Sequence, residues 1–154
     1  MEYEDLFNKI KTAFTAELIV QITAMNIART DTVLVAPGAW YEESLDDEAK
    51  SYDYFAFIGT SDTSGKGNGP ALAVDYAIEI DLFIPNRQNG LIQKEIKRYN
   101  HILMKTAQNI WRKVANGYGD IEINVLSPIN ASLNNSSRAY KLLGINLKFT
   151  MVHN

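Results

Sequence analysis

The chain has 154 residues, of which 46% are apolar, with a formal net charge of −3 and no cysteine. The missing cysteine excludes disulfides, thiol catalysis and thiolate metal sites. No apolar run approaches the roughly 18 residues of a membrane span, and the acidic start, Met1-Glu2-Tyr3-Glu4-Asp5, is unlike the basic start of a secretory signal. We therefore expect one domain over residues 1–154, with a packed core, that is made and used without export.

The first fifty residues predict a helix, a short strand and a loop. Residues 3–14 have apolar side chains at helical spacing and acidic residues in the first turn, where the helix dipole favours them. Residues 17–28 fit both helical spacing and strand alternation, and we favour the helix. The β-branched run at 32–36 ends at Pro37-Gly38 and predicts a strand, whereas the acidic residues 41–51 predict a loop or a loose helical turn.

A glycine-rich stretch separates two predicted strands. Residues 51–59 are rich in aromatic side chains and predict a strand. Residues 59–70 contain four glycines and predict a mobile hairpin loop that orders on a partner. They do not match a phosphate-binding loop, because five residues separate Gly59 from Gly65 and Gly67 stands where a magnesium-binding Ser or Thr belongs. The candidate partner-ordered residues are Ser64, Gly65, Lys66, Gly67 and Asn68.

Residues 71–84 alternate over their whole length and predict a long strand of about 45 Å, at about 3.3 Å per residue. One face is apolar, and the other carries Asp75, Glu79 and Asp81. Three carboxylates on one face are compatible with a metal site or an acid–base pair. Since a neighbouring strand can place Lys148 and Lys141 opposite them, we favour cross-strand ion pairs instead.

The helix predicted for residues 90–115 has two faces of opposite character. The apolar face comprises Ile92, Ile96, Tyr99, Leu103, Ala107, Ile110 and Val114. The basic face comprises Lys94, Arg98, His101, Lys105, Gln108 and Arg112. We expect the first face to pack on a core and the second to meet solvent or something negatively charged.

The remaining residues predict two strands and a turn. Residues 121–125 and 140–152 alternate as strands do, and residues 129–137 predict a polar turn. Strands that are polar on one side favour an antiparallel sheet with one face in water. We therefore predict an α+β fold in two layers: a mostly antiparallel sheet of four to five strands, a long helix packed on one face, and an N-terminal helix.

Opposite charges are segregated along the chain. Residues 91–114 contain six Lys or Arg against one Glu, and residues 42–53 contain six Asp or Glu against one Lys. Three interpretations of the basic face stay open: a solvated surface, a contact with an acidic patch on another copy or another protein, and a contact with nucleic-acid phosphates. The balancing acidic stretch favours the second. The candidate subunit interface comprises Lys94, Arg98, Lys105, Arg112, Glu42, Glu43, Asp46 and Asp47.

No pattern of residues indicates enzymatic chemistry. His101 lies on the basic face, His153 is next to the last residue, and the sequence has no Gly-x-Ser-x-Gly nucleophile elbow. Trp40 and Trp111 are expected to be core or interface anchors. We therefore expect no catalytic residue, cofactor, metal, small-molecule substrate or membrane partner.

The order of the elements is itself distinctive. A helical start leads to a sheet with a glycine-rich hairpin, the strand ALAVDYAIEIDLFIPN leads into the long helix, and RAYKLLGINLKFTMVHN ends the chain. In this order the chain resembles the tail terminator and tail-completion proteins of long-tailed bacteriophages. The resemblance implies a virion structural protein whose copies form a hexameric ring. Such a ring caps the tail tube, joins the tail to the head connector and leaves a channel for DNA.

Two alternatives remain at this point. The first is a head-completion or other neck protein of the same virion. The second is a nucleic-acid-binding module that uses the basic face. The resemblance transfers no individual residue, because the family has no invariant motif to match.

Overall fold

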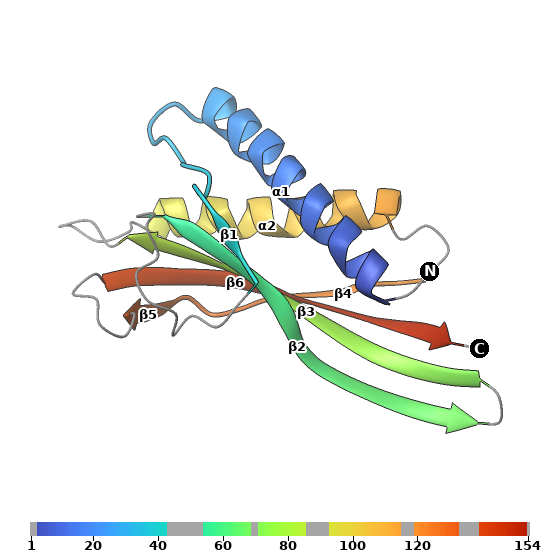
Figure 1. The fold of residues 1–154 in the computed structure, drawn as a ribbon. Helices are drawn as coiled ribbons and strands as arrows, with labels where there is room; N and C mark the ends of the chain where they lie inside the picture. Colours follow the sequence, from blue (N-terminus) through green and yellow to red (C-terminus); the bar gives the residue numbers. More distant parts are fainter. Residues whose placement is uncertain are drawn as a thin grey trace.

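The computed structural model describes residues 3–42, 54–68, 71–85, 93–114, 119–132 and 139–153. The fold has two layers, a six-stranded sheet and two helices that lie on the same face of it (Figure 1). The elements are α1 (Tyr3–Ala28), β1 (Trp40–Tyr41), β2 (Phe55–Asn68), β3 (Ala71–Pro85), α2 (Gln93–Val114), β4 (Glu122–Val125), β5 (Ile129–Ser132) and β6 (Ala139–His153). The predicted α+β class is confirmed, with six strands in place of four to five.

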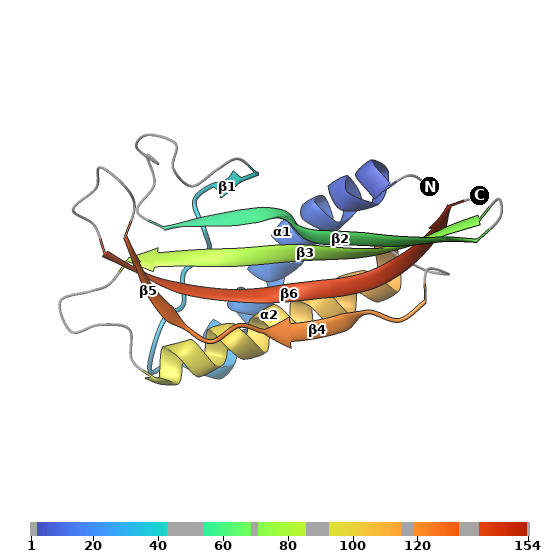
Figure 2. The ribbon, with the colours of Figure 1, turned by 90° about the horizontal axis from the view of Figure 1, so that it is seen from below.

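Three long strands form the middle of the sheet. The strand order is β1-β2-β3-β6-β4, and β5 pairs with the beginning of β6. Every pair is antiparallel except β1 with β2. β3 pairs with β2 on one side and with β6 on the other over nearly its whole length (Figure 2). The predicted strands at 71–84, 121–125 and 140–152 are thus confirmed as β3, β4 and β6.

α1 is one continuous helix, so the helical interpretation of residues 17–28 is confirmed. Its buried residues recur every four positions and face the sheet: Leu6, Ile10, Phe14, Leu18 and Ile22. Near its N-terminus the Tyr3 ring stacks on the Tyr76 ring of β3, with centroids 4.0 Å apart. The Tyr3 hydroxyl also lies 2.9 Å from Oγ1 of Thr60 in β2. α1 therefore crosses the long strands diagonally (Figure 1).

α2 buries the face that its residue spacing predicts. Its buried residues include Ile96, Tyr99, Leu103, Ala107 and Ile110. Val114 is half-buried, whereas Ile92 lies outside the described residues. The amphipathic pattern alone was therefore sufficient to place this helix on the sheet.

Both tryptophans are core anchors. Trp111 of α2 packs on Phe149 of β6, with ring centroids 5.0 Å apart, and its Nε1–H donates to the carbonyl of Gly119 at 2.9 Å. Trp40 of β1 meets the Phe14 ring edge-on at 6.1 Å. These contacts tie α2 to β6, and β1 to α1.

Residues 32–36 do not form the predicted strand. The Asn26 side chain donates to the Leu34 carbonyl at 2.9 Å and accepts from the Leu34 N–H at 2.8 Å. The Tyr99 hydroxyl accepts from the Val35 N–H at 2.9 Å and donates to the Val35 carbonyl at 3.1 Å. Because backbone groups removed from water need partners, side chains from both helices here take the place of a neighbouring strand.

Two predicted loops are strands. Residues 59–68, predicted as a mobile loop, belong to β2 and pair with β3 up to Asn68 opposite Ala71, with a register shift between Thr60 and Thr63. The hairpin itself is confirmed, and residues 69–70 at its turn lie outside the described residues. Residues 129–132, predicted as part of a polar turn, form β5. In both places the partner strand supplies the ordering that the local sequence lacks.

The sheet face opposite the helices is not wet throughout. Phe55, Phe83 and Tyr140 form a second buried cluster there, with the Phe55 and Phe83 rings stacked at 4.8 Å. Asp81 on the same face is also buried. The prediction of one water-exposed face is therefore wrong at this end of the sheet. It holds toward the other end, where Asp75, Lys148 and Thr150 are exposed.

Candidate interaction surfaces

The predicted ion pairs between carboxylates and lysines of the sheet are not formed. The register places Asp75 opposite Thr150, whose hydroxyl donates to it at 2.5 Å, and Glu79 opposite Asn146. Lys148 stands opposite Ala77, and the Lys141 ammonium donates to Asn130 on β5 at 3.3 Å. Knowing that two strands pair does not fix which residues face each other. Here the register places no lysine directly opposite Asp75 or Glu79, whereas Lys148 stands opposite Glu122 of β4.

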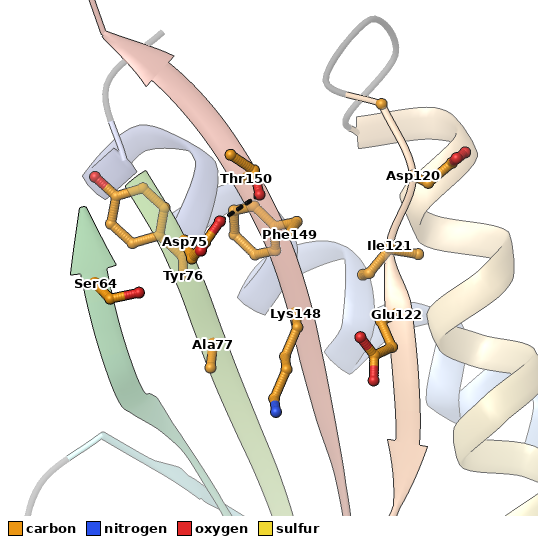
Figure 3. A pocket seen from close by; sticks show the side chains of 11 residues that line it. Ser64, Asp75, Tyr76, Ala77, Asp120, Ile121, Glu122, Lys148, Phe149 and Thr150 are labelled. Carbon is orange, nitrogen blue, oxygen red and sulfur yellow. Dashed lines mark hydrogen bonds between the residues drawn. The ribbon is translucent and has the colours of Figure 1, made fainter. Parts of the chain in front are cut away.

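A shallow groove of about 720 Å³ lies beside this part of the sheet. Phe149 and Thr150 of β6 line one side, and Asp120 and Ile121, just before β4, line the other (Figure 3). Within the described part of the chain, no group of three or more His, Asp or Glu side chains is placed to hold a metal ion. The charged residues in its lining are Asp75, Asp120, Glu122 and Lys148, and the lining contains no histidine.

Asp81 has a perturbed carboxyl group without a catalytic setting. It is 4% exposed, and its Oδ1 has no hydrogen-bond partner among the described residues. Burial, together with a hydrogen bond and charge repulsion from Glu79 on the same face of β3, raises the pKa of Asp81 to about 8. At neutral pH this carboxyl therefore keeps its proton, which removes the cost of burying a charge.

Half of the predicted basic interface is engaged within the chain. The Lys94 ammonium lies 2.6 Å and the Arg98 guanidinium 2.9 Å from the two carboxylate oxygens of Asp31. These two hydrogen bonds lower the pKa of Asp31 to about 2. Lys94 and Arg98 thus hold the segment that follows α1 against α2. Neither the spacing of these two residues nor the acidic stretch at 42–53 indicated that Asp31 would be their partner.

The acidic half of the predicted interface is mostly outside the described residues. Glu42 is described, and it pairs with Lys11 of α1 at 2.7 Å. Glu43, Asp46 and Asp47 are not described. The proposed pairing of the two charged stretches between copies therefore stays a prediction for these three residues, and Glu42 has a partner of its own.

Four cations of α2 face solvent. Lys97, Lys105, Arg112 and Lys113 are exposed, and none of them has an ion pair with the residues that the structure describes. His101 is exposed among them. This narrower set, of which the sequence analysis had singled out Lys105 and Arg112, is what remains of the basic face for an external partner.

An uncharged stripe on the outside of α1 was not recognised from the sequence. It comprises Ala16, Ile19, Val20, Thr23 and Ile27, all exposed, and Ile27 retains 76% of its accessible surface. Val33 and Val35 of the following segment are exposed as well. The sequence does indicate this stripe, because residues 18–28 contain no charged residue. Apolar side chains all round a helix indicate that another surface covers it.

Two strand edges complete the candidate surfaces. Among the described residues, no strand pairs with the outer edge of β2 after Phe57, or with the outer edge of β6 after Lys148. Both edges begin beside α1 and continue into the part of the sheet that extends beyond it (Figure 1). The predicted partner-ordered residues Ser64, Gly65, Lys66, Gly67 and Asn68 all lie on the β2 edge, as parts of a strand.

Comparisons with known proteins add no identity to these surfaces. No protein-family model matches the sequence, and no curated protein matches it significantly. Neither described helix has the length and apolar character that crossing a membrane requires.

Proposed function

We propose that this protein is a structural subunit of a bacteriophage virion that forms a ring at the head–tail junction, in the manner of the tail terminators it resembles. The observation that carries the proposal is the combination of unpaired strand edges with an uncharged exposed stripe on α1 among the described residues. Open edges and apolar patches are features that proteins normally cover with a partner.

The kinds of surface present also favour a ring. A closed ring of identical copies uses a heterologous interface, in which one patch meets a different patch on the neighbour. This chain has several unlike patches: the β2 edge, the β6 edge, the stripe on α1 and the cations of α2. The tail tube protein and the connector are the proposed axial partners, and a head-completion or other neck protein is the nearest alternative within the same virion.

Imaging combined with a mass measurement tests the proposal. The purified protein is examined by light scattering over a wide concentration range and by negative-stain microscopy, alone and with isolated tail tubes. We expect annular particles with a central channel, or protein bound at tube ends. A protein that stays monomeric at the highest concentration and also does not bind tail tubes would argue against this function.

A nucleic-acid-binding role has one observation in its favour, the exposed cations Lys97, Lys105 and Arg112 of α2, which form no ion pair with the described residues. Replacing Lys97, Lys105 and Arg112 by Gln should then weaken DNA binding and flatten its dependence on salt. The matched control is Lys94→Gln, because Lys94 is already paired with Asp31. Absence of binding by the unaltered protein at low salt eliminates this role.

A further inference from the structure

At the end of the sheet where β2 joins β3, the described strands are β2, β3 and β6, with β3 in the middle. Among the described residues, the outer edges of β2 and β6 are unpaired there. Thr63, Ser64, Gly65, Lys66 and Gly67 of β2 stand opposite Tyr76 to Leu72 of β3. The same β3 residues stand opposite Phe149 to His153 of β6 on the other side. The open edge of β6 therefore lies at the same level of the sheet as Thr63–Gly67, which are part of the longer open edge of β2 (Figure 2).

We propose that copies of this chain join edge to edge, with the β2 edge at Thr63–Gly67 of one copy pairing with the β6 edge at Phe149–His153 of the next. This inference rests on the ring assembly proposed above and names its interface. An open edge presents a row of backbone N–H and C=O groups that serves as a template for pairing with another strand. The chain itself supplies a second open edge at the same level of the sheet, so a second copy is the occupant to which we commit.

The strand directions distinguish this pairing from a simple dimer. β2 and β6 are each antiparallel to β3, so they run parallel to each other. A neighbour related by rotation about an axis along the strands places its β2 parallel to β6, and the contact repeats from copy to copy. A two-fold pairing of β2 with β2, in contrast, uses one edge twice and ends at two copies.

Side chains near these edges are compatible with a neighbour. Ser64, Thr150 and Val152 are exposed on one face, and Val152 retains 63% of its accessible surface. On the other face Gly65 leaves Leu72 of β3 42% exposed. Neither edge contains a proline in this stretch, so every residue can offer its backbone N–H to another strand.

Engineered cysteines test the proposal, because the natural chain has none. Within one chain Ser64 and Thr150 are separated by two strand spacings, about 10 Å, which is too far for a disulfide. The double variants Ser64→Cys/Thr150→Cys and Ser64→Cys/Val152→Cys cover two registers of the contact. Under mild oxidation at high protein concentration we expect at least one of them to form a ladder of bands beyond the dimer.

The control variants make every outcome decisive. Ser64→Cys alone and Thr150→Cys alone should stay uncrosslinked, and so should Thr150→Cys/Gln108→Cys, whose second cysteine lies on the exposed face of α2. Dimers from Ser64→Cys alone would show a two-fold β2 contact and overturn the proposal. Rings without a ladder would overturn this interface and leave the proposed function standing, whereas neither rings nor a ladder would count against both.

Discussion

The carboxylate of Asp81 in β3 lies directly over Gly144 in β6, its cross-strand neighbour. A Cβ at position 144 would collide with Oδ1 of Asp81 and would lie 3.0 Å from the Ile80 carbonyl. Both groups are held in the middle of the sheet, where neither strand can move away. Glycine at 144 is thus required by the position of a buried acid on the next strand.

Gly144→Ala should therefore destabilise the fold by about 1–3 kcal/mol, the usual cost of overpacking a buried site. Urea unfolding followed by circular dichroism measures the change. The matched control is Gly65→Ala, because a Cβ there would make ordinary contacts of 3.6 Å with Leu72 and Val74. The control should change stability by no more than about 0.5 kcal/mol. Equal effects at the two glycines would contradict the steric argument.

Asp81 should make stability depend on pH in an unusual direction. Its carboxyl keeps the proton up to about pH 8 in the folded state, whereas an unfolded Asp releases it near pH 4. The unfolded state therefore binds fewer protons between about pH 4 and pH 8, so this group lowers the free energy of unfolding as pH rises through that window.

Asp81→Asn should remove this contribution, because the amide does not titrate. Relative to the natural protein, we expect the variant to gain about 3–4 kcal/mol between pH 5 and pH 8, at about 1.4 kcal/mol per pH unit. Denaturant unfolding at a series of pH values gives both curves. Asp75→Asn, an exposed acid on the same face of β3, should keep the natural slope. Parallel curves for Asp81→Asn and the natural protein would show that Asp81 ionises normally.

Asp31 should titrate well below an ordinary aspartate, with a pKa of about 2. Since this pKa is lowered on folding, the stabilising effect of the pair with Lys94 and Arg98 is complete above about pH 4 and is lost as pH falls toward 2. NMR titration of the Asp31 carboxyl measures the pKa directly. In Lys94→Gln/Arg98→Gln the pKa should return toward 3.8, whereas Lys105→Gln should leave it unchanged.

Asn26→Ala should loosen the segment after α1. The substitution removes both hydrogen bonds to Leu34 and leaves a part-buried N–H and C=O without partners, at a cost of about 1–3 kcal/mol. Hydrogen exchange at the Leu34 amide should accelerate more than exchange in β3. Asn109→Ala, which removes only a hydrogen bond to Glu17 at 3.1 Å, is the comparison variant. Unchanged protection of Leu34 would show that the Asn26 contacts do not hold this segment.

The stripe on α1 should affect assembly and not folding. Ile27→Glu introduces a charge at a side chain that is 76% exposed, so monomer stability should change by no more than about 0.5 kcal/mol. If a partner covers the stripe, burying this charge should shift light-scattering profiles toward the monomer. Arg29→Glu, just beyond the helix and also exposed, tests whether added charge alone has this effect. Assembly that tolerates Ile27→Glu would leave the stripe as bare surface.

Periodicity in the sequence correctly predicted the elements that bury one continuous face. The apolar stripe of α2 and the alternation in β3 are dictated by one buried face each, so local sequence was sufficient. Residues 59–68 were not predicted to be a strand, because their glycines and polar residues show no alternation. They form a strand because they pair with β3. Residues 32–36 were predicted to be a strand from their β-branched run, but side chains of Asn26 and Tyr99 satisfy this backbone in place of a neighbouring strand.

The candidate surfaces were harder to predict, because charge counts do not identify partners. Lys94 and Arg98 were grouped with Lys105 and Arg112 by spacing, yet Asp31, more than sixty residues earlier, takes the first two. The residues of the uncharged stripe on α1 were predicted to be helical, but their exposure was not predicted, because side chains of these types usually form a core. Which charges pair and which apolar side chains stay exposed depends on how each helix packs against its neighbours. This packing could not be predicted from the single sequence.

The topology also has a consequence for synthesis. β6 is the last strand of the chain, yet it lies between β3 and β4. A nascent chain that has not yet produced β6 has no partner for one side of β3 and nothing for β4 or β5 to join. The sheet can therefore form in full only after β6 has been synthesised, and until then β3 has an unpaired edge.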